Sequence, residues 1–143
     1  MRGFKLGLAL VVALGAAPLA SAQSQREIGR RYSQAYKACM KDKVKTPEIR
    51  QCIWDEQNRQ DVILNTTYRR LVSKLPPGGR SKLKSEQSAW IKYSKTKCEN
   101  EYNKNADKYG EGTMYLIIFD YCNLDEKIKR RDRLSTMEKM HDK

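Results

Sequence analysis

The chain has 143 residues with 29 Lys and Arg against 17 Asp and Glu, a formal net charge of +12 at pH 7. This length suits one small domain. The only histidine, His141, lies near the C-terminal end, and no acidic pair has an apolar setting. Cys–His, Ser–His and paired-carboxylate chemistry are therefore not expected, and we predict that the protein is not an enzyme.

Residues 1–22 have the features of a bacterial secretory signal peptide. Arg2 and Lys5 precede the apolar run of residues 6–14, and the small residues 20–22 suit a signal peptidase. We expect cleavage before Gln23, so that residues 23–143 form a single domain in the periplasm or outside the cell. Loss of Arg2 and Lys5 lowers the formal net charge from +12 to +10.

A membrane anchor is not expected in the mature chain. A spanning helix needs about 20 apolar residues, and the apolar run is broken at Gly15 and Pro18. A lipid anchor requires a cysteine directly after the cleavage site, where Gln23 stands, and the first cysteine is Cys39.

After a weakly patterned helical stretch at residues 25–40, apolar residues at steps of three and four predict a long helix. Thr46 can cap it, Pro47 suits its first position, and the run Pro76-Pro77-Gly78-Gly79 is expected to end it after about 30 residues. Its inward positions are Ile49, Cys52, Ile53, Gln60, Leu64, Tyr68, Leu71 and Leu75.

Two further helices follow. The second is expected over residues 81–104, with the inward stripe Leu83, Gln87, Trp90, Ile91, Ser94 and Cys98. Residues 103–112 are polar and predict a loop, after which Thr113 can cap a third helix that frays from Glu138 onward. The inward positions of this third helix are Ile117, Tyr121, Leu124 and Ile128, followed less regularly by Leu134 and Met137.

These patterns predict an all-α fold, an antiparallel three-helix bundle with an N-terminal arm or short helix. Four cysteines in an exported chain indicate two disulfides, formed by Cys39, Cys52, Cys98 and Cys122. Zinc sites usually bring ligands in close pairs. The wide spacing of these four cysteines does not favour a zinc site, and we expect no metal and no cofactor.

The spacing favours the pairs Cys39–Cys52 and Cys98–Cys122. The first pair folds the N-terminal arm back onto the first long helix. The second joins antiparallel neighbours at matching levels. The alternative pairing, Cys39–Cys98 with Cys52–Cys122, is compatible with a bundle and stays open.

Three phrases of the sequence resemble the signature of the LprI-type lysozyme-inhibitor family, a group of exported bacterial domains, most without an established activity. Together they span residues 39–134. The residues that carry the resemblance, besides the cysteines, are Asp61, Leu64, Asn65, Tyr68, Gln87, Trp90, Arg130 and Leu134. The chain departs from the family at Ser94-Lys95, where members commonly show an arginine and an acidic residue, and it lacks the anchoring cysteine of the founding type.

Most of these signature residues have a structural explanation. Leu64, Tyr68, Trp90 and Leu134 fall on inward stripes and are expected in the core. Asn65 and Gln87 are expected to be buried amides whose hydrogen bonds are met within a polar network that includes Tyr68 or Asp61.

The resemblance implies an exported envelope protein that inhibits a cell-wall lytic enzyme, with a lysozyme-like muramidase as partner. Lysozymes of the c type are basic, so long-range steering toward this basic chain would be repulsive. A local acidic patch would relieve that repulsion. The candidates are Asp55, Glu56 and Asp61 on the first long helix, or Glu99 and Glu101 after the second.

The alternative function is a basic envelope module that binds anionic polymer or lipid head groups without inhibiting anything. A charge of +10 exceeds the magnitude of about 2 to 8 that suits a small soluble domain, and the lysines that supply it are expected to be exposed. A nucleic-acid partner is not expected, because the chain has no recognised nucleic-acid motif and its aromatic residues fall mostly on core stripes.

Overall fold

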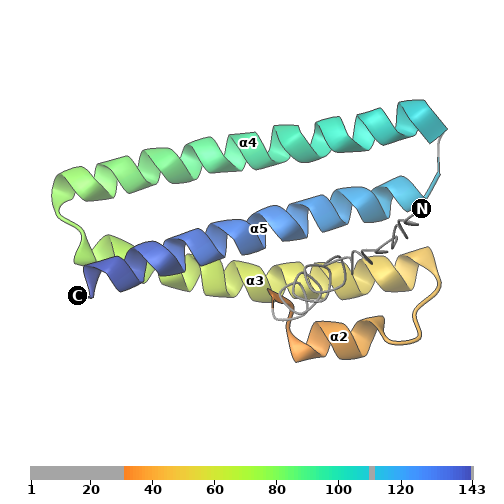
Figure 1. Ribbon diagram of the computed structural model, residues 1–143, viewed down its shortest axis with the longest axis horizontal. Coiled ribbons are helices and arrows are strands. Elements are labelled where there is room, and N and C mark those ends of the chain that lie inside the picture. Colours follow the sequence, from red (N-terminus) through yellow and green to blue (C-terminus); the bar gives the residue numbers. More distant parts are fainter. Residues whose placement is uncertain (1–30, 110–111, 143) are drawn as a thin grey trace, which may run out of the picture. The chain divides into compact units, whose positions relative to one another are not determined.

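The structure, a computed structural model, describes residues 31–109 and 112–142 (Figure 1). The expected signal peptide, and residues 25–30 of the expected first helical stretch, lie outside the described residues. The chain divides into a unit of residues 1–31 and a unit of residues 32–143, and all described residues except Arg31 belong to the second. Within the described ranges, no helix combines the length and apolar character that a membrane span requires.

The second unit is all-α, as expected, and its helices are α2 (Gln34–Met40), α3 (Thr46–Lys74), α4 (Pro77–Tyr109) and α5 (Met114–His141). In Figure 1, α5 runs between α3 and α4. It packs most extensively on α3 and less extensively on α4, whereas α3 and α4 touch only slightly and the short α2 packs on α3. The central position therefore belongs to α5.

The apolar core divides into two clusters along α3 and α5. One cluster joins the first half of α3 to α2 and the first half of α5, with Ile53, Leu124 and Ile128 fully buried. The other joins the second half of α3 to the end of α5 and includes Leu71, Leu83 and Leu134. The predicted inward stripes of α3 and α5 are therefore largely confirmed.

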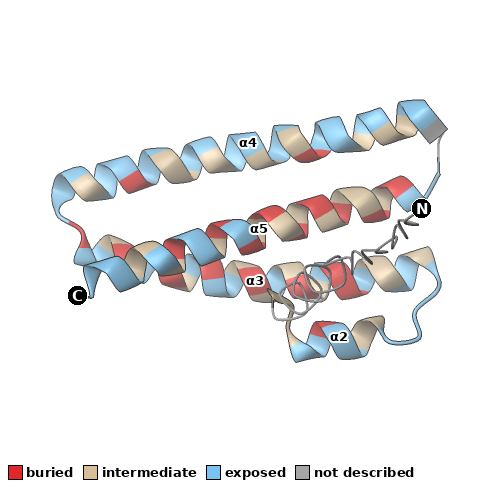
Figure 2. Cartoon of the chain, in the orientation of Figure 1, coloured by how far each residue is buried: buried red, intermediate tan, exposed pale blue. Residues whose placement is uncertain are grey.

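Helix α4 contributes little to this core, as Figure 2 shows. Its described buried side chains are Leu83 and Cys98, whereas Ile91, expected on the inward stripe, is 54% exposed. That expectation is wrong. A helix that packs mainly on one neighbour needs only a narrow apolar stripe. Ile91 directly follows Trp90 in the sequence and falls at the edge of that stripe, so its side chain is exposed.

Two expected helix boundaries are also wrong. The chain turns at Leu75 and Pro76, and Pro77 opens α4, because a proline at the first helical position has no N–H that needs a partner. The stretch from Asn103 to Tyr109 is helical rather than a loop. Residues 103–109 are polar but contain no glycine or proline, so nothing in them breaks a helix.

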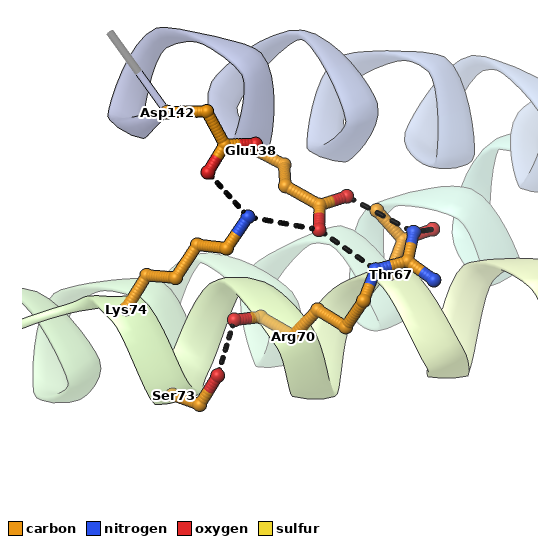
Figure 3. Close-up of polar contacts among 6 residues, drawn as sticks. All are labelled: Thr67, Arg70, Ser73, Lys74, Glu138 and Asp142. Atoms are coloured by element: carbon orange, nitrogen blue, oxygen red, sulfur yellow. Dashed lines mark hydrogen bonds and ion pairs between the residues drawn. The ribbon is translucent and has the colours of Figure 1, made fainter.

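The end of α5 does not fray at Glu138, because ion pairs hold it against α3 (Figure 3). Glu138 accepts hydrogen bonds from Arg70 Nε at 2.7 Å and Arg70 Nη2 at 3.0 Å. Lys74 Nζ lies 3.3 Å from Glu138 and 2.5 Å from Asp142. The hydrogen bonds from Arg70, with those from Lys74, lower the pKa of Glu138 to about 2.

Two disulfides are present, Cys39–Cys52 and Cys98–Cys122. This is the pairing that the spacing favoured, and the open alternative is not the one formed. The first bridge ties α2 to the second turn of α3, with Cα atoms 5.7 Å apart. The second ties α4 to α5, with Cα atoms 5.5 Å apart. Because α4 buries few apolar side chains, this bridge helps to hold α4 against α5.

A polar groove between two helices as the candidate functional site

Several charged side chains are buried along α3 and α5, and their burial was not predicted from the sequence. They are Glu56, Asp120, Glu126 and Arg130. Spacing could have found Glu56, which comes three residues after Ile53 and four before Gln60 on the inward stripe of α3. Buried charges need partners, and each of these four has at least one.

Glu56 is completely buried and serves the fold. Its carboxylate accepts hydrogen bonds from Ser33, from Arg59 Nε at 2.8 Å and from Gln60 Nε2 at 2.7 Å. Arg131 in turn donates to Gln60. Burial alone would raise the pKa of Glu56, but these hydrogen bonds outweigh it and the pKa is lowered.

The proposed acidic patch on α3 is therefore wrong. Glu56 faces the interior, Asp55 accepts a hydrogen bond from Gln51 at 3.0 Å, and Asp61 pairs with Lys127 at 2.5 Å. The second candidate patch is present but partly neutralised. Glu99 and Glu101 are about half exposed, and each lies 3.9 Å from a lysine one helical turn before it, Lys95 and Lys97 respectively.

A groove of about 400 Å³ lies between α4 and α5. Its walls carry acidic, basic and aromatic side chains in close proximity. Those from α4 are Glu86, Ala89, Trp90 and Tyr93, and those from α5 are Glu126, Lys129, Arg130 and Arg133. Two signature residues of the resemblance, Trp90 and Arg130, thus line the same groove from opposite helices.

Three residues that line this groove each have one buried side-chain atom without a hydrogen-bond partner among the described residues: Glu86 Oε2, Trp90 Nε1 and Arg130 Nη2. Arg130 is 4% exposed and is held by Gln87, whose Oε1 accepts from Arg130 Nε at 2.8 Å. Burial, together with the charge of Arg133, lowers the pKa of Arg130. Unpaired buried polar atoms are uncommon in folded proteins, and here they gather in one place.

The other buried charge of the groove is satisfied. Glu126 accepts hydrogen bonds from Lys97 Nζ at 2.7 Å and from Lys129 Nζ at 3.2 Å. Burial raises the pKa of Glu126, but these two partners outweigh it, so the pKa is lowered. The unmet hydrogen-bonding capacity is therefore concentrated on Glu86, Trp90 and Arg130.

The remaining signature residues lie elsewhere. Leu64 and Leu134 are buried, and Tyr68 packs beside them. Asn65 is exposed, so its expected burial is wrong: it directly follows the inward Leu64, and one helical step turns it away from the core. Gln87 is half-buried, but it accepts its hydrogen bond from Arg130 and not from Tyr68.

A second surface feature lies where α3 begins. Val44 is 84% exposed and Trp54 is 43% exposed, and both line a groove of about 700 Å³. The Arg50 guanidinium lies 4.8 Å from the centre of the Trp54 ring. The adjoining loop of residues 41–45 contains three exposed lysines, Lys41, Lys43 and Lys45.

Comparison with known proteins gives one match. The family described as "Lysozyme inhibitor LprI" matches residues 39–134. No curated protein and no solved structure is similar enough to this chain to match it. The matched range covers both disulfides and both walls of the groove.

Proposed function

Because that match covers more than half of the chain, the protein belongs to the LprI lysozyme-inhibitor family, and we propose that it is exported and blocks a lysozyme-like muramidase by binding it. The match over residues 39–134 is the observation that carries this proposal. An inhibitor of this kind needs a surface complementary to the enzyme's cleft and no catalytic group of its own.

We propose that the surface at the start of α3 is the one that contacts the muramidase. Trp54 and Val44 are exposed apolar side chains, and Arg50 lies against the Trp54 ring. Tryptophan and arginine are enriched among the residues that dominate binding energy at protein interfaces. Val44, Arg50 and Trp54 therefore supply side chains that suit a protein–protein contact and that solubility alone does not require.

Charge supports the same surface. Glycoside hydrolases usually carry two carboxylates on either side of the scissile bond. The loop of residues 41–45 offers three exposed lysines, of which Lys45 lines the same groove as Trp54, and the bridge Cys39–Cys52 closes the segment that contains the loop. A basic inhibitor can thus meet a basic enzyme where the enzyme is locally acidic.

The two disulfides and the family indicate an extracytoplasmic protein. We further propose that residues 1–22 are removed as a signal peptide and that the mature protein resides in the periplasm or is secreted. N-terminal sequencing of the exported protein tests this, with Gln23 as the expected first residue.

The function is tested by the lysis of a cell-wall suspension by c-type lysozyme, with and without the purified, disulfide-bonded protein. We expect a dose-dependent loss of lysis and a complex that can be isolated by gel filtration. The reduced and alkylated protein is the control and should not inhibit. Failure to inhibit this enzyme, together with no muramidase recovered from envelope extract, would contradict the proposal.

Salt distinguishes this function from the alternative, a basic module that binds anionic polymer or lipid head groups. Charge-driven binding weakens steeply as salt rises from about 0.01 to 1 M. Binding to a muramidase through Trp54 and Val44, with the lysines contributing only part of the affinity, should weaken much less across that range. Recovery of anionic polymer rather than enzyme, with a steep salt dependence, would favour the alternative.

A further inference from the structure

We propose that the groove between α4 and α5 is a binding site for an anionic saccharide, a sugar ring that carries a carboxylate or a phosphate. This site is separate from the contact surface proposed above. The groove residues come from α4 and α5, whereas Trp54 and the loop of residues 41–45 belong to α3 and the segment before it. The inference therefore does not depend on inhibition of a muramidase.

The charge of the ligand follows from the unpaired donors. Arg130 Nη2 and Trp90 Nε1 can only donate hydrogen bonds, and neither has an acceptor among the described residues. Arg130 is almost fully buried, with 4% of its surface exposed. Lys129 and Arg133 also line the groove. Glu86 and Glu126 line it as well, so three positive charges stand against two negative ones. An anionic group can accept hydrogen bonds from these donors and would be attracted by the net positive charge.

The third unpaired atom is an acceptor, so the same ligand should also carry a hydrogen-bond donor. Glu86 Oε2 is an acceptor without a partner in the described part of the chain. A ligand ammonium group would be attracted to Glu86 but repelled by Lys129, Arg130 and Arg133. A neutral hydroxyl or amide N–H satisfies Glu86 without that repulsion. The complement of the groove is therefore an anion with a nearby hydroxyl or amide, which a sugar acid or sugar phosphate provides.

Aromatic side chains and size agree with a sugar ring. Trp90 and Tyr93 line the groove, and Tyr93 is 58% exposed, so an apolar ring face can pack against it. The volume of about 400 Å³ lies within the usual range for small-ligand sites. The three unpaired atoms expose less than 1 Å² each, so binding includes a shift of exposed side chains at the rim, of which Tyr93 and Arg133 are two.

Tryptophan fluorescence offers a direct test, because the chain has only two tryptophans, Trp54 and Trp90. The Trp54→Phe variant with both disulfides formed leaves Trp90 as the only tryptophan reporter. It is titrated with N-acetylmuramic acid, with N-acetylglucosamine 1-phosphate and with neutral N-acetylglucosamine. We expect saturable binding of at least one anionic sugar and at least about 10-fold weaker binding of the neutral one.

Substitutions then locate the site, with affinity measured by calorimetry. Trp90→Phe removes the indole N–H, Arg130→Gln removes the charge and Glu86→Gln changes the acceptor, and each should weaken binding about 10-fold or more. Glu48→Gln and Arg69→Gln, both exposed and away from the groove, are the matched controls and should bind normally. Circular dichroism shows whether each variant is folded.

Three results would overturn the inference. These are no binding of either anionic sugar at millimolar concentration, equal binding of the neutral sugar, or full affinity in folded Trp90→Phe and Glu86→Gln proteins. Binding of only the carboxylate or only the phosphate identifies which anion the site accepts. Lysozyme inhibition by the Trp90→Phe, Arg130→Gln and Glu86→Gln proteins should stay normal, because these residues lie outside the proposed contact surface.

Discussion

Ser33 and Glu56 are joined by two hydrogen bonds across the α2–α3 interface. The backbone N–H of Ser33 donates to Glu56 Oε1 at 2.9 Å, and the Ser33 hydroxyl donates to Oε2 at 2.5 Å. The same hydroxyl accepts from the backbone N–H of Tyr36 and so caps α2. One buried carboxylate thereby fixes the start of a short helix that would be marginal alone.

The first prediction concerns this carboxylate. Glu56→Ala should lower the free energy of unfolding by about 2 to 3 kcal/mol, because it leaves several hydrogen-bonding groups around the site unpaired. Urea unfolding of the oxidised protein measures the change. The neighbouring Asp55→Ala is the control and should stay within about 0.5 kcal/mol of wild type. Equal effects of the two substitutions would contradict a special role for Glu56.

The second prediction is a loss of stability in acid. The pKa values of Glu56, Glu126 and Glu138 are all lowered in the folded protein, to about 2 for Glu138, from an ordinary value of 4.5. Their contribution is present above pH 4.5 and disappears as the pH falls through the lowered values. The melting temperature should therefore be nearly flat from pH 7 to about 5 and then fall.

Glu138→Gln serves as the internal check on that prediction. It removes one of the three lowered carboxylates, so its melting temperature should fall less steeply with acid than that of wild type. Parallel curves for the two proteins would mean that the contacts with Arg70 and Lys74 contribute nothing measurable.

The third prediction concerns the attachment of α4. Replacing both Cys98 and Cys122 by Ala should destabilise the protein by about 3 kcal/mol. Because α4 buries little apolar surface of its own, amide hydrogen exchange in its second half should accelerate more than exchange in α3. The Cys39→Ala, Cys52→Ala double variant is the comparison, and its faster exchange should instead fall on α2. Uniform acceleration in both variants would show that α4 is not separately attached.

The fourth prediction addresses the proposed contact with a muramidase. Trp54→Ala should weaken inhibition about 10-fold or more, as loss of an interface anchor does, with little change in the melting temperature. Ile91→Ala is the matched control, since Ile91 is 54% exposed, comparable to Trp54 at 43%, but lies on α4. Normal inhibition by a folded Trp54→Ala protein would remove this surface from consideration.

Much of the fold could be predicted from the sequence because the relevant signals are local. The proline at the start of the helix, Pro47, and the three-and-four spacing from Ile49 to Leu75 depend only on helix geometry. The predicted cap at Thr46 is wrong, because α3 begins at Thr46 itself, after Lys45, and no side chain caps it. The short segment between Cys39 and Cys52 favours their pairing. The inward stripe of α5 from Ile117 to Leu134 is equally local. Helix type and approximate extent could thus be predicted without a structure, whereas the disulfide pairing was favoured by the sequence but decided by the structure.

Only the tertiary structure decided which polar residues are buried and what they contact. The spacing of Glu56 along α3 predicts an inward side chain, whereas its charge predicts an exposed one. Its burial depends on hydrogen bonds from Ser33, the residue that caps α2. The groove brings Trp90 of α4 beside Arg130 of α5, residues 40 positions apart in the chain. Burial of a polar group is stable only when distant partners meet it, and periodicity along one helix carries no information about those partners.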